Sequence, residues 1–288
     1  MKYILFFLLL TINTYAYEAF ISAPELKANL DNQKLVILDV NSKESYEKSH
    51  IQNALHVDIT KFKDSQKNIY TILESMWTQR RLEKLGIEKD SDVVIYARSD
   101  QQLNASYFAM ILILSGFENI SILDGGYMTW TFKYNRLVSN EKSSAKSDDS
   151  YEININKTIL VNTNYVQRSI DNAYIIDSRD TPYYFGTKKL LTSKHFGHIP
   201  SAKSSFYKDK FLDDLTIRKD SDIEDIFLLG LELDTDKDII VYGDSVFDAS
   251  MNWYILYRKL GFKNAKIYEG SFKRWDELDK QTISFKWE

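Results

Sequence analysis

The chain has 288 residues, a formal net charge of −4 and no cysteine. This length suits about two domains of roughly 100–200 residues each, and 44% hydrophobic with 27% charged residues is ordinary for a globular protein. The acidic balance argues against nucleic acid or an anionic lipid surface as a partner, and the lack of cysteine excludes disulfides and any thiol nucleophile.

Residues 1–16 have the pattern of a signal peptide. Lys2 gives a positive start, residues 4–12 are almost entirely apolar, and Ala16 is a small residue at the expected cleavage point. The apolar run is shorter than the roughly 20 residues that cross a bilayer. We therefore expect cleavage near Ala16, no membrane span afterwards, and a periplasmic or secreted protein; an uncleaved N-terminal anchor is the alternative.

The first half of the remaining chain alternates short apolar runs with helical stretches. Residues 36–39 and 93–96 are continuous aliphatic runs, as expected for strands buried on both faces of a parallel sheet. Gly116 follows an apolar helical stretch and fits a helix C-terminus. Another apolar run, Ile120–Leu123, comes directly after it.

A serine-, lysine- and aspartate-rich segment follows and separates the two halves. It has no large apolar residue after Val138 until Tyr151, so it predicts a solvated linker over residues 139–152. The predicted domains on either side cover residues 20–138 and 153–288.

The second half repeats the order of the first at a period of about 145 residues, which is too long for a solenoid and suits a duplicated domain. Residues 174–177 match 36–39, and residues 239–242 match 93–96. Gly261 corresponds to Gly116. The alternation predicts an α/β fold of two similar domains, each with a mainly parallel sheet flanked by helices.

Three motifs of the second half carry a family resemblance. They are Asp177-Ser178-Arg179, Gly197-His198-Ile199-Pro200-Ser201-Ala202, and Tyr268-Glu269-Gly270-Ser271 with Trp275. On these motifs, and on their partial repetition in the first half, the chain resembles the tandem-domain rhodanese family of thiosulfate and 3-mercaptopyruvate sulfurtransferases. The resemblance covers nearly the whole chain after the signal peptide.

The resemblance implies an active-site loop that begins directly after Tyr242. In the family this loop opens with a catalytic cysteine that becomes a persulfide, and here Gly243 holds that position. No catalytic residue is therefore predicted. Ala97 begins the corresponding loop of the first half, which is usually inert in two-domain members. The predicted active-site-like loop comprises Gly243, Asp244, Ser245, Val246, Phe247 and Asp248.

Each charged residue of the site has two readings. Asp248 precedes a helix predicted from Ala249, so it is interpreted as an N-cap, with ligand binding as the alternative. Asp244 is a turn former or a ligand for a cation or amine. Asp177 and Arg179 are possible ligand anchors or a buried ion pair that orders the loop.

Two histidines and two lysines of the second half are not assigned to a functional site. His195 and His198 lie three residues apart, but no third ligand has suitable spacing, so no metal and no cofactor is predicted. Lys208 and Lys210 are interpreted as part of a solvated face.

The leading functional hypothesis is an exported, non-catalytic rhodanese homologue that binds, scaffolds or regulates. Its partner would be an unidentified protein or small ligand. The alternative is a sulfurtransferase-family enzyme with altered or residual small-ligand chemistry in the second-half loop, with Asp244 or Asp248 as an acid or base.

Overall fold

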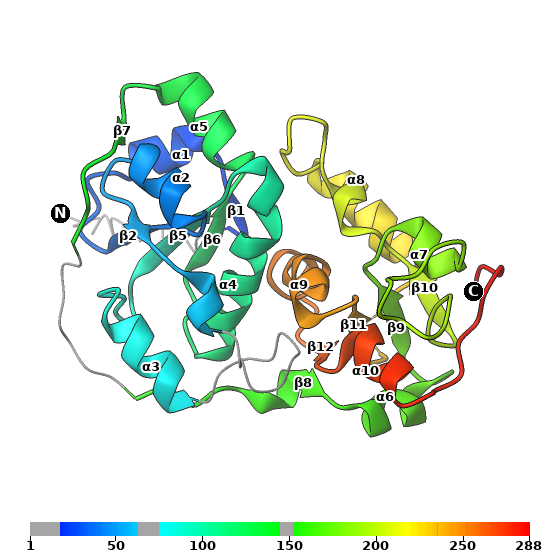
Figure 1. Ribbon diagram of the computed structural model, residues 1–288. Helices are drawn as coiled ribbons and strands as arrows, with labels where there is room; N and C mark the ends of the chain where they lie inside the picture. The colour runs from blue at the N-terminus through cyan, green and yellow to red at the C-terminus, as the bar shows by residue number, and fades with distance from the viewer. Residues whose placement is uncertain (1–17, 63–74, 145–151, 235) are drawn as a thin grey trace, which may run out of the picture.

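The computed structural model describes residues 18–62, 75–144, 152–234 and 236–288, and shows two α/β domains side by side (Figure 1). Each contains a five-stranded parallel sheet, with the order β1-β6-β5-β2-β4 in the first domain and β8-β12-β11-β9-β10 in the second. Each strand of one sheet has a counterpart at the same place in the other. The predicted α/β fold with two mainly parallel sheets is confirmed.

The first domain is built from short strands and helices in alternation. Its strands are β1 (Phe20–Ile21), β2 (Leu35–Asp39), β3 (His50–Ile51), β4 (Leu55–His56), β5 (Asp92–Tyr96), β6 (Ile120–Leu123) and β7 (Val138–Ser139). Its α-helices are α1 (Ala23–Ala28), α2 (Lys43–Lys48), α3 (Ser75–Glu83), α4 (Gln102–Leu114) and α5 (Gly126–Tyr134), with the 3₁₀ turns η1 (Ile59–Phe62) and η2 (Ser99–Gln101).

The second domain repeats this plan with some differences in its turns. Its strands are β8 (Leu160–Val161), β9 (Tyr174–Asp177), β10 (Ala202–Ser204), β11 (Ile239–Tyr242) and β12 (Ala265–Tyr268). Its α-helices are α6 (Thr163–Ser169), α7 (Thr181–Phe185), α8 (Asp220–Glu224), α9 (Val246–Tyr254) and α10 (Ser271–Glu277). The 3₁₀ helices are η3 (Lys157–Ile159) and η4 (Tyr207–Lys210), and the π-helical segments η5 (Asp225–Gly230) and η6 (Ile255–Lys259) continue α8 and α9.

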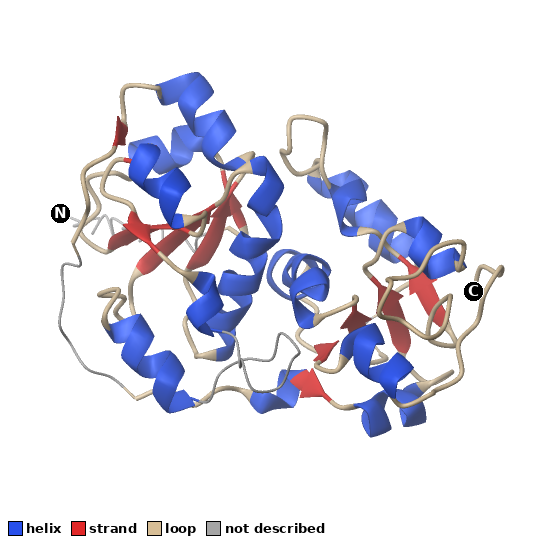
Figure 2. Ribbon diagram, in the orientation of Figure 1, coloured by secondary structure: helices blue, strands red, loops and turns tan. Residues whose placement is uncertain are grey.

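Helices α4 and α9 lie between the two sheets and join the domains (Figure 2). Most of α4 is buried, as expected for a helix that is apolar on all sides. The hydroxyls of Ser106 and Ser250 lie 2.8 Å apart across this contact, and the rings of Tyr107 and Phe247 pack beside them. One hydrophobic core therefore runs through both domains.

The start of the predicted linker and the residues that directly follow it contact the first domain. Ser139 belongs to β7, which pairs with β3. The buried Ile153 and the Asn156 N–H, which donates to the Leu114 carbonyl at 2.8 Å, attach the far end to the same domain. Ile153 and Ile155 supply apolar side chains at alternate positions and pack into the core.

The predicted signal peptide, residues 1–16, lies outside the described residues. Within the part of the chain that the structure describes, no helix is both long enough and apolar enough to cross a bilayer.

The interpretation of Lys210 as a solvated residue is wrong, because its side chain is buried in the second domain. Its ammonium group donates to the Ser205 hydroxyl at 2.6 Å and to the Phe206 carbonyl at 2.8 Å. Burial lowers the pKa of Lys210 to about 7. Sequence reasoning missed this because Lys210 sits among charged neighbours, and only the fold places it against Phe227.

Candidate functional site

The candidate site lies where the chain leaves the carboxyl ends of β9 and β11, the edge at which open parallel sheets bind ligands. Asp177 is the last residue of β9, and Tyr242 is the last residue of β11. The two residues are register partners on neighbouring strands. The phenolic hydroxyl of Tyr242 donates to Asp177 Oδ2 at 2.6 Å, which joins the two loops at their origin.

Arg179 is fully engaged by neighbouring groups of the protein. Its Nη2 donates to Asp177 Oδ2 at 2.6 Å and to the Gly197 carbonyl at 2.8 Å, and its Nε donates to Asp177 Oδ1 at 3.0 Å. The guanidinium plane stacks 3.8 Å from the ring centroid of Phe272. The Arg179 side chain is only 4% exposed. The structure therefore shows the buried ion pair directly, whereas an anchoring role toward a ligand stays a prediction.

Gly243 is in close contact with the first turn of the helix that follows it. A Cβ atom built on Gly243 would lie 2.5 Å from the Asp248 Cβ and 3.1 Å from the Ala249 nitrogen. Its carbonyl also accepts a hydrogen bond from the Phe272 N–H at 2.8 Å. Glycine is thus required here by the close approach of the backbone rather than by an unusual φ angle.

Helix α9 begins at Val246, three residues earlier than the predicted start at Ala249. Ser245 is its N-cap, and Asp248 holds the third helical position rather than the cap itself. The Ser245 N–H and hydroxyl both donate to Asp248 Oδ2, at 2.9 and 2.8 Å, in a capping box. The loop proper is therefore reduced to Gly243 and Asp244, and the Asp248 carboxylate takes up donors at the helix start that could otherwise face an anion.

The site carries three carboxylates, from Asp177, Asp244 and Asp248, against the single guanidinium of Arg179. Asp244 Oδ1 lies 3.6 Å from Arg179 Nη1. Burial raises the pKa of Asp244 to about 6, although Arg179 opposes the shift, and Asp248 and Asp177 add to it. Burial also raises the pKa of Asp248. The Asp244 side chain is 26% exposed, so it is the carboxylate of the ion pair that solvent reaches.

We expect replacement of Asp244 by asparagine to stabilise the protein at neutral pH. The folded state holds the Asp244 proton up to about pH 6, whereas the unfolded state releases it near 3.8. The native protein therefore loses stability as the pH rises from about 4 to 6, and Asp244→Asn removes this loss. At pH 7 we expect a gain on the order of 1–3 kcal/mol.

Urea unfolding at pH 4 to 8 measures this difference, with Asp180→Asn as the control because Asp180 is exposed and lies outside the ion pair. A stability difference between native protein and Asp244→Asn that stays constant over this pH range would contradict the raised pKa.

The corresponding site of the first domain holds its guanidinium in a different loop. Arg98, which follows β5, stacks 3.9 Å from the ring centroid of Tyr127. The backbone N–H of Arg98 donates to Asn41 Oδ1 at 2.7 Å. Asn41 occupies the position that Arg179 holds in the second domain, and Arg98 the position of Asp244. In both domains a guanidinium therefore lies over an aromatic ring at the equivalent position, Tyr127 or Phe272. The arginine comes from the loop after β5 in the first domain and from the loop after β9 in the second.

The loop of the first domain has almost no free space. The cavity beside Ala97 and Arg98 measures about 20 Å³, which is room for about one water molecule. Phe211 and Leu215 of the second domain form part of its wall. The first-domain loop is therefore covered by the interface and offers no site for a ligand of substrate size.

The structure brings the predicted residues Asp177, Arg179, Asp244 and Asp248 together in one cluster. Val246 and Phe247 belong instead to the first turn of α9 and to the domain interface. His198 Nδ1 lies 2.8 Å from the Tyr184 carbonyl, and His195 Nδ1 lies 2.8 Å from Asp276 Oδ1.

Sequence reasoning missed the stacking of Arg179 on Phe272 and the capping box. The capping box had a local signal, which is the spacing Ser245-x-x-Asp248 before an apolar run. The signal was missed because the family resemblance assigned these residues to a six-residue loop. The aromatic contact had no local signal, because Phe272 lies 93 positions further along the chain.

Comparison with known proteins gives the family of both domains. The rhodanese-like domain family matches residues 22–133 and 162–278. A protein of Saccharopolyspora erythraea named "Putative thiosulfate sulfurtransferase" is 26% identical over 272 residues, which cover 91% of this chain and 94% of that protein.

Two solved structures share the fold at lower sequence identity. The anaerobic ergothioneine biosynthesis enzyme from Chlorobium limicola, solved with trimethyl histidine, superimposes with a TM-score of 0.77 at 17% identity, covering 92% of this chain and 70% of that one. YnjE superimposes with a TM-score of 0.75 at 20% identity, covering 87% of this chain and 62% of that one.

Proposed function

The chain belongs to the rhodanese family, and from this premise we propose that it is a family member without sulfur-transfer activity that serves as a binding, scaffolding or regulatory protein. Sulfur transfer requires a thiolate that can carry sulfane sulfur. The chain has no cysteine at any position, and Gly243 stands where the family's nucleophile would be. This replacement, within a loop too tight for a side chain, is the observation that carries the proposal.

The electrostatics of the loop support the same conclusion. An anionic donor such as thiosulfate would meet Asp244 and Asp248, and each like-charge contact at about 4–6 Å costs on the order of 1–4 kcal/mol in a medium of intermediate dielectric. Arg179 offsets little of this cost, because Asp177 and the Gly197 carbonyl accept from its Nε and Nη2 groups, and Asp244 Oδ1 lies 3.6 Å from its Nη1. The loss of the nucleophile is therefore accompanied by loss of the anion-binding cradle.

A standard sulfurtransferase assay tests this proposal. The native protein is incubated with thiosulfate and cyanide, and with 3-mercaptopyruvate and cyanide, and thiocyanate is measured. We expect no thiocyanate above that formed in buffer. Formation that scales with protein concentration in a cysteine-free preparation would overturn the proposal.

We also propose that the protein is exported to the periplasm or secreted, on the basis of the N-terminal pattern around Lys2 and Ala16. N-terminal sequencing of the protein recovered from cell fractions tests this. An N-terminus at Met1 in a cytoplasmic fraction would contradict export.

Asp244 supports a second candidate function, a family member with altered chemistry in the second-domain loop. A partly exposed carboxyl group with a pKa of about 6 is suited to transfer protons near neutral pH. This function predicts a ligand-dependent rise in melting temperature that is lost in Asp244→Ala. A screen of sulfur oxyanions, thiols, amines and divalent metals measures it, and no shift across the set would argue against it.

A further inference from the structure

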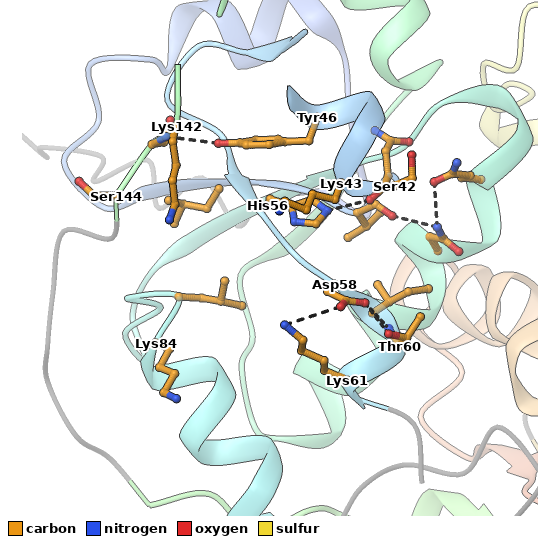
Figure 3. Close-up of a pocket in the computed structure, with 18 residues that line it drawn as sticks. Ser42, Lys43, Tyr46, His56, Asp58, Thr60, Lys61, Lys84, Lys142 and Ser144 are labelled. Carbon is orange, nitrogen blue, oxygen red and sulfur yellow. Dashed lines mark hydrogen bonds and ion pairs between the residues drawn. The ribbon is translucent and has the colours of Figure 1, made fainter. Parts of the chain in front are cut away.

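A cavity of the first domain lies beside the chain that follows β5, with Gln101 and Asn104 in its lining (Figure 3). Its volume is about 980 Å³, which is the size of a pocket for a ligand of nucleotide dimensions. Asn41 and Asp58, which follow the carboxyl ends of β2 and β4, lie in its wall. It therefore occupies the edge of the sheet at which α/β domains bind small molecules.

The charge of this cavity opposes the charge of the whole protein. The described residues that line it include four lysines and one acidic residue, Asp58, in a chain whose net charge is −4. The lysines are Lys43, Lys61, Lys84 and Lys142. Positive charge gathered around a concave surface attracts anions and concentrates them there.

These lysines have little competition from the protein's own acids. Within the described part of the chain, Lys43 forms an ion pair with Glu47 at 3.5 Å. Both side chains are well exposed, and such pairs contribute little to stability. Lys84 and Lys142 have no ion-pair partner among the residues that the structure describes. Their charges are therefore available to a ligand.

Asp58 is already compensated by its neighbours. The Thr60 hydroxyl donates to Asp58 Oδ1 at 2.5 Å, and Lys61 Nζ lies 3.7 Å from Asp58 Oδ2. Burial opposes these contacts, but together they hold the pKa of Asp58 below its usual value. The Asp58 carboxylate is thus partly neutralised, and the Lys61 side chain points toward it (Figure 3).

The linker supplies part of the wall. Figure 3 shows Lys142 extending into the space below Tyr46. The Ser143 N–H donates to the Tyr46 hydroxyl at 3.3 Å, which holds this part of the linker against α2. Apolar side chains, among them Leu55 and Leu85, line another part of the cavity. The combination of several ammonium groups with an apolar wall suits an organic molecule that carries more than one negative charge.

We propose that this cavity binds a phosphorylated small molecule of about nucleotide size, with its phosphate groups held by Lys61, Lys84 and Lys142. Lysine is a common phosphate ligand because its ammonium group acts as a mobile point charge with three donors. The site is separate from the second-domain loop, so it would operate whether or not that loop retains any chemistry.

Isothermal titration calorimetry of the native chain with inorganic tripolyphosphate, adenosine triphosphate and adenosine tests the proposal. We expect both phosphates to bind, adenosine to bind far more weakly, and the affinity for both phosphates to fall as salt screens the lysines. The variant Lys61→Ala/Lys142→Ala should bind both phosphates at least about 10-fold more weakly.

The matched control is Lys133→Ala/Lys188→Ala, which removes the same charge from two exposed lysines outside the cavity. It should change the affinity by less than about twofold, because the two sites lie outside contact distance of the ligand. Equal weakening by both double variants, adenosine binding as tightly as adenosine triphosphate, or no heat from either phosphate at millimolar concentration would each overturn the proposal. The thiocyanate assay reads the other domain, so its result is independent.

Discussion

Replacing Asp177 by alanine is expected to destabilise the protein by about 3–5 kcal/mol, the cost of leaving one member of a buried ion pair without its partner. The Asp177 side chain is fully buried and receives hydrogen bonds from Arg179 and from the Tyr242 hydroxyl. Its loss leaves the Arg179 guanidinium buried with only the Gly197 carbonyl and the more distant Asp244. Because a domain is stable by only about 5–15 kcal/mol, this is a large fraction of the total.

Urea unfolding at pH 7 measures this effect, and Asp180→Ala is the matched control. Asp180 is exposed, and its side chain makes no capping hydrogen bond to α7, so we expect a change within about 0.5 kcal/mol. If Asp177→Ala does not fold, Asp177→Asn keeps the shape and should retain an intermediate stability. A loss below about 1 kcal/mol for Asp177→Ala would show that the ion pair does not hold the loop.

Any side chain at position 243 is expected to destabilise the second domain. In Gly243→Ala the new Cβ would lie 2.5 Å from the Asp248 Cβ, so the first turn of α9 must move. Overpacking of this kind costs typically about 1–3 kcal/mol. Gly243→Cys adds a sulfur atom to the same contact and should cost at least as much.

Gly230→Ala provides the comparison for position 243. A Cβ there would lie 3.5 Å from the Asp225 carbonyl oxygen, which is an ordinary contact, and Gly230 is exposed. We expect thermal unfolding of Gly230→Ala to match that of the native protein and Gly243→Ala to unfold at a lower temperature. Equal melting temperatures for the two variants would contradict the close packing of the loop.

The architecture could be predicted from the sequence because strands buried on both faces leave long apolar runs. Residues 93–96 and 239–242 became the central strands β5 and β11, at equivalent places in their sheets. The motif residues Asp177 and Arg179 could likewise be placed at the end of a strand. Such features depend on contacts that are local in the chain or that repeat between the halves.

The chemistry of the loop could be predicted only in part. The assignment of Gly243 to the nucleophile position stays a prediction from the family resemblance, and the start of α9 at Val246 was not evident from the sequence. Arg98 and Arg179 come from different loops of their domains, yet each guanidinium lies over an equivalent aromatic ring. This similarity is seen only when the two domains are compared in space.

The lysine-lined cavity left no pattern in the sequence at all. Its wall is assembled from α2, the segments that follow β2, β4 and α3, the start of α4 and the linker. These segments meet only through the fold. Lysines such as Lys61 and Lys142 are therefore indistinguishable in the sequence from those of any solvated surface.

The most direct test of the account is sulfur transfer by Gly243→Cys. We propose that the remodelled loop, and not only the missing sulfur, prevents catalysis, since α9 crowds position 243 and Asp244 and Asp248 oppose an anionic donor. Purified Gly243→Cys that shows a cooperative melt is assayed with thiosulfate and cyanide. We expect thiocyanate at the level of the native protein, whereas multiple turnovers by this single variant would show that the donor site is intact and contradict the account.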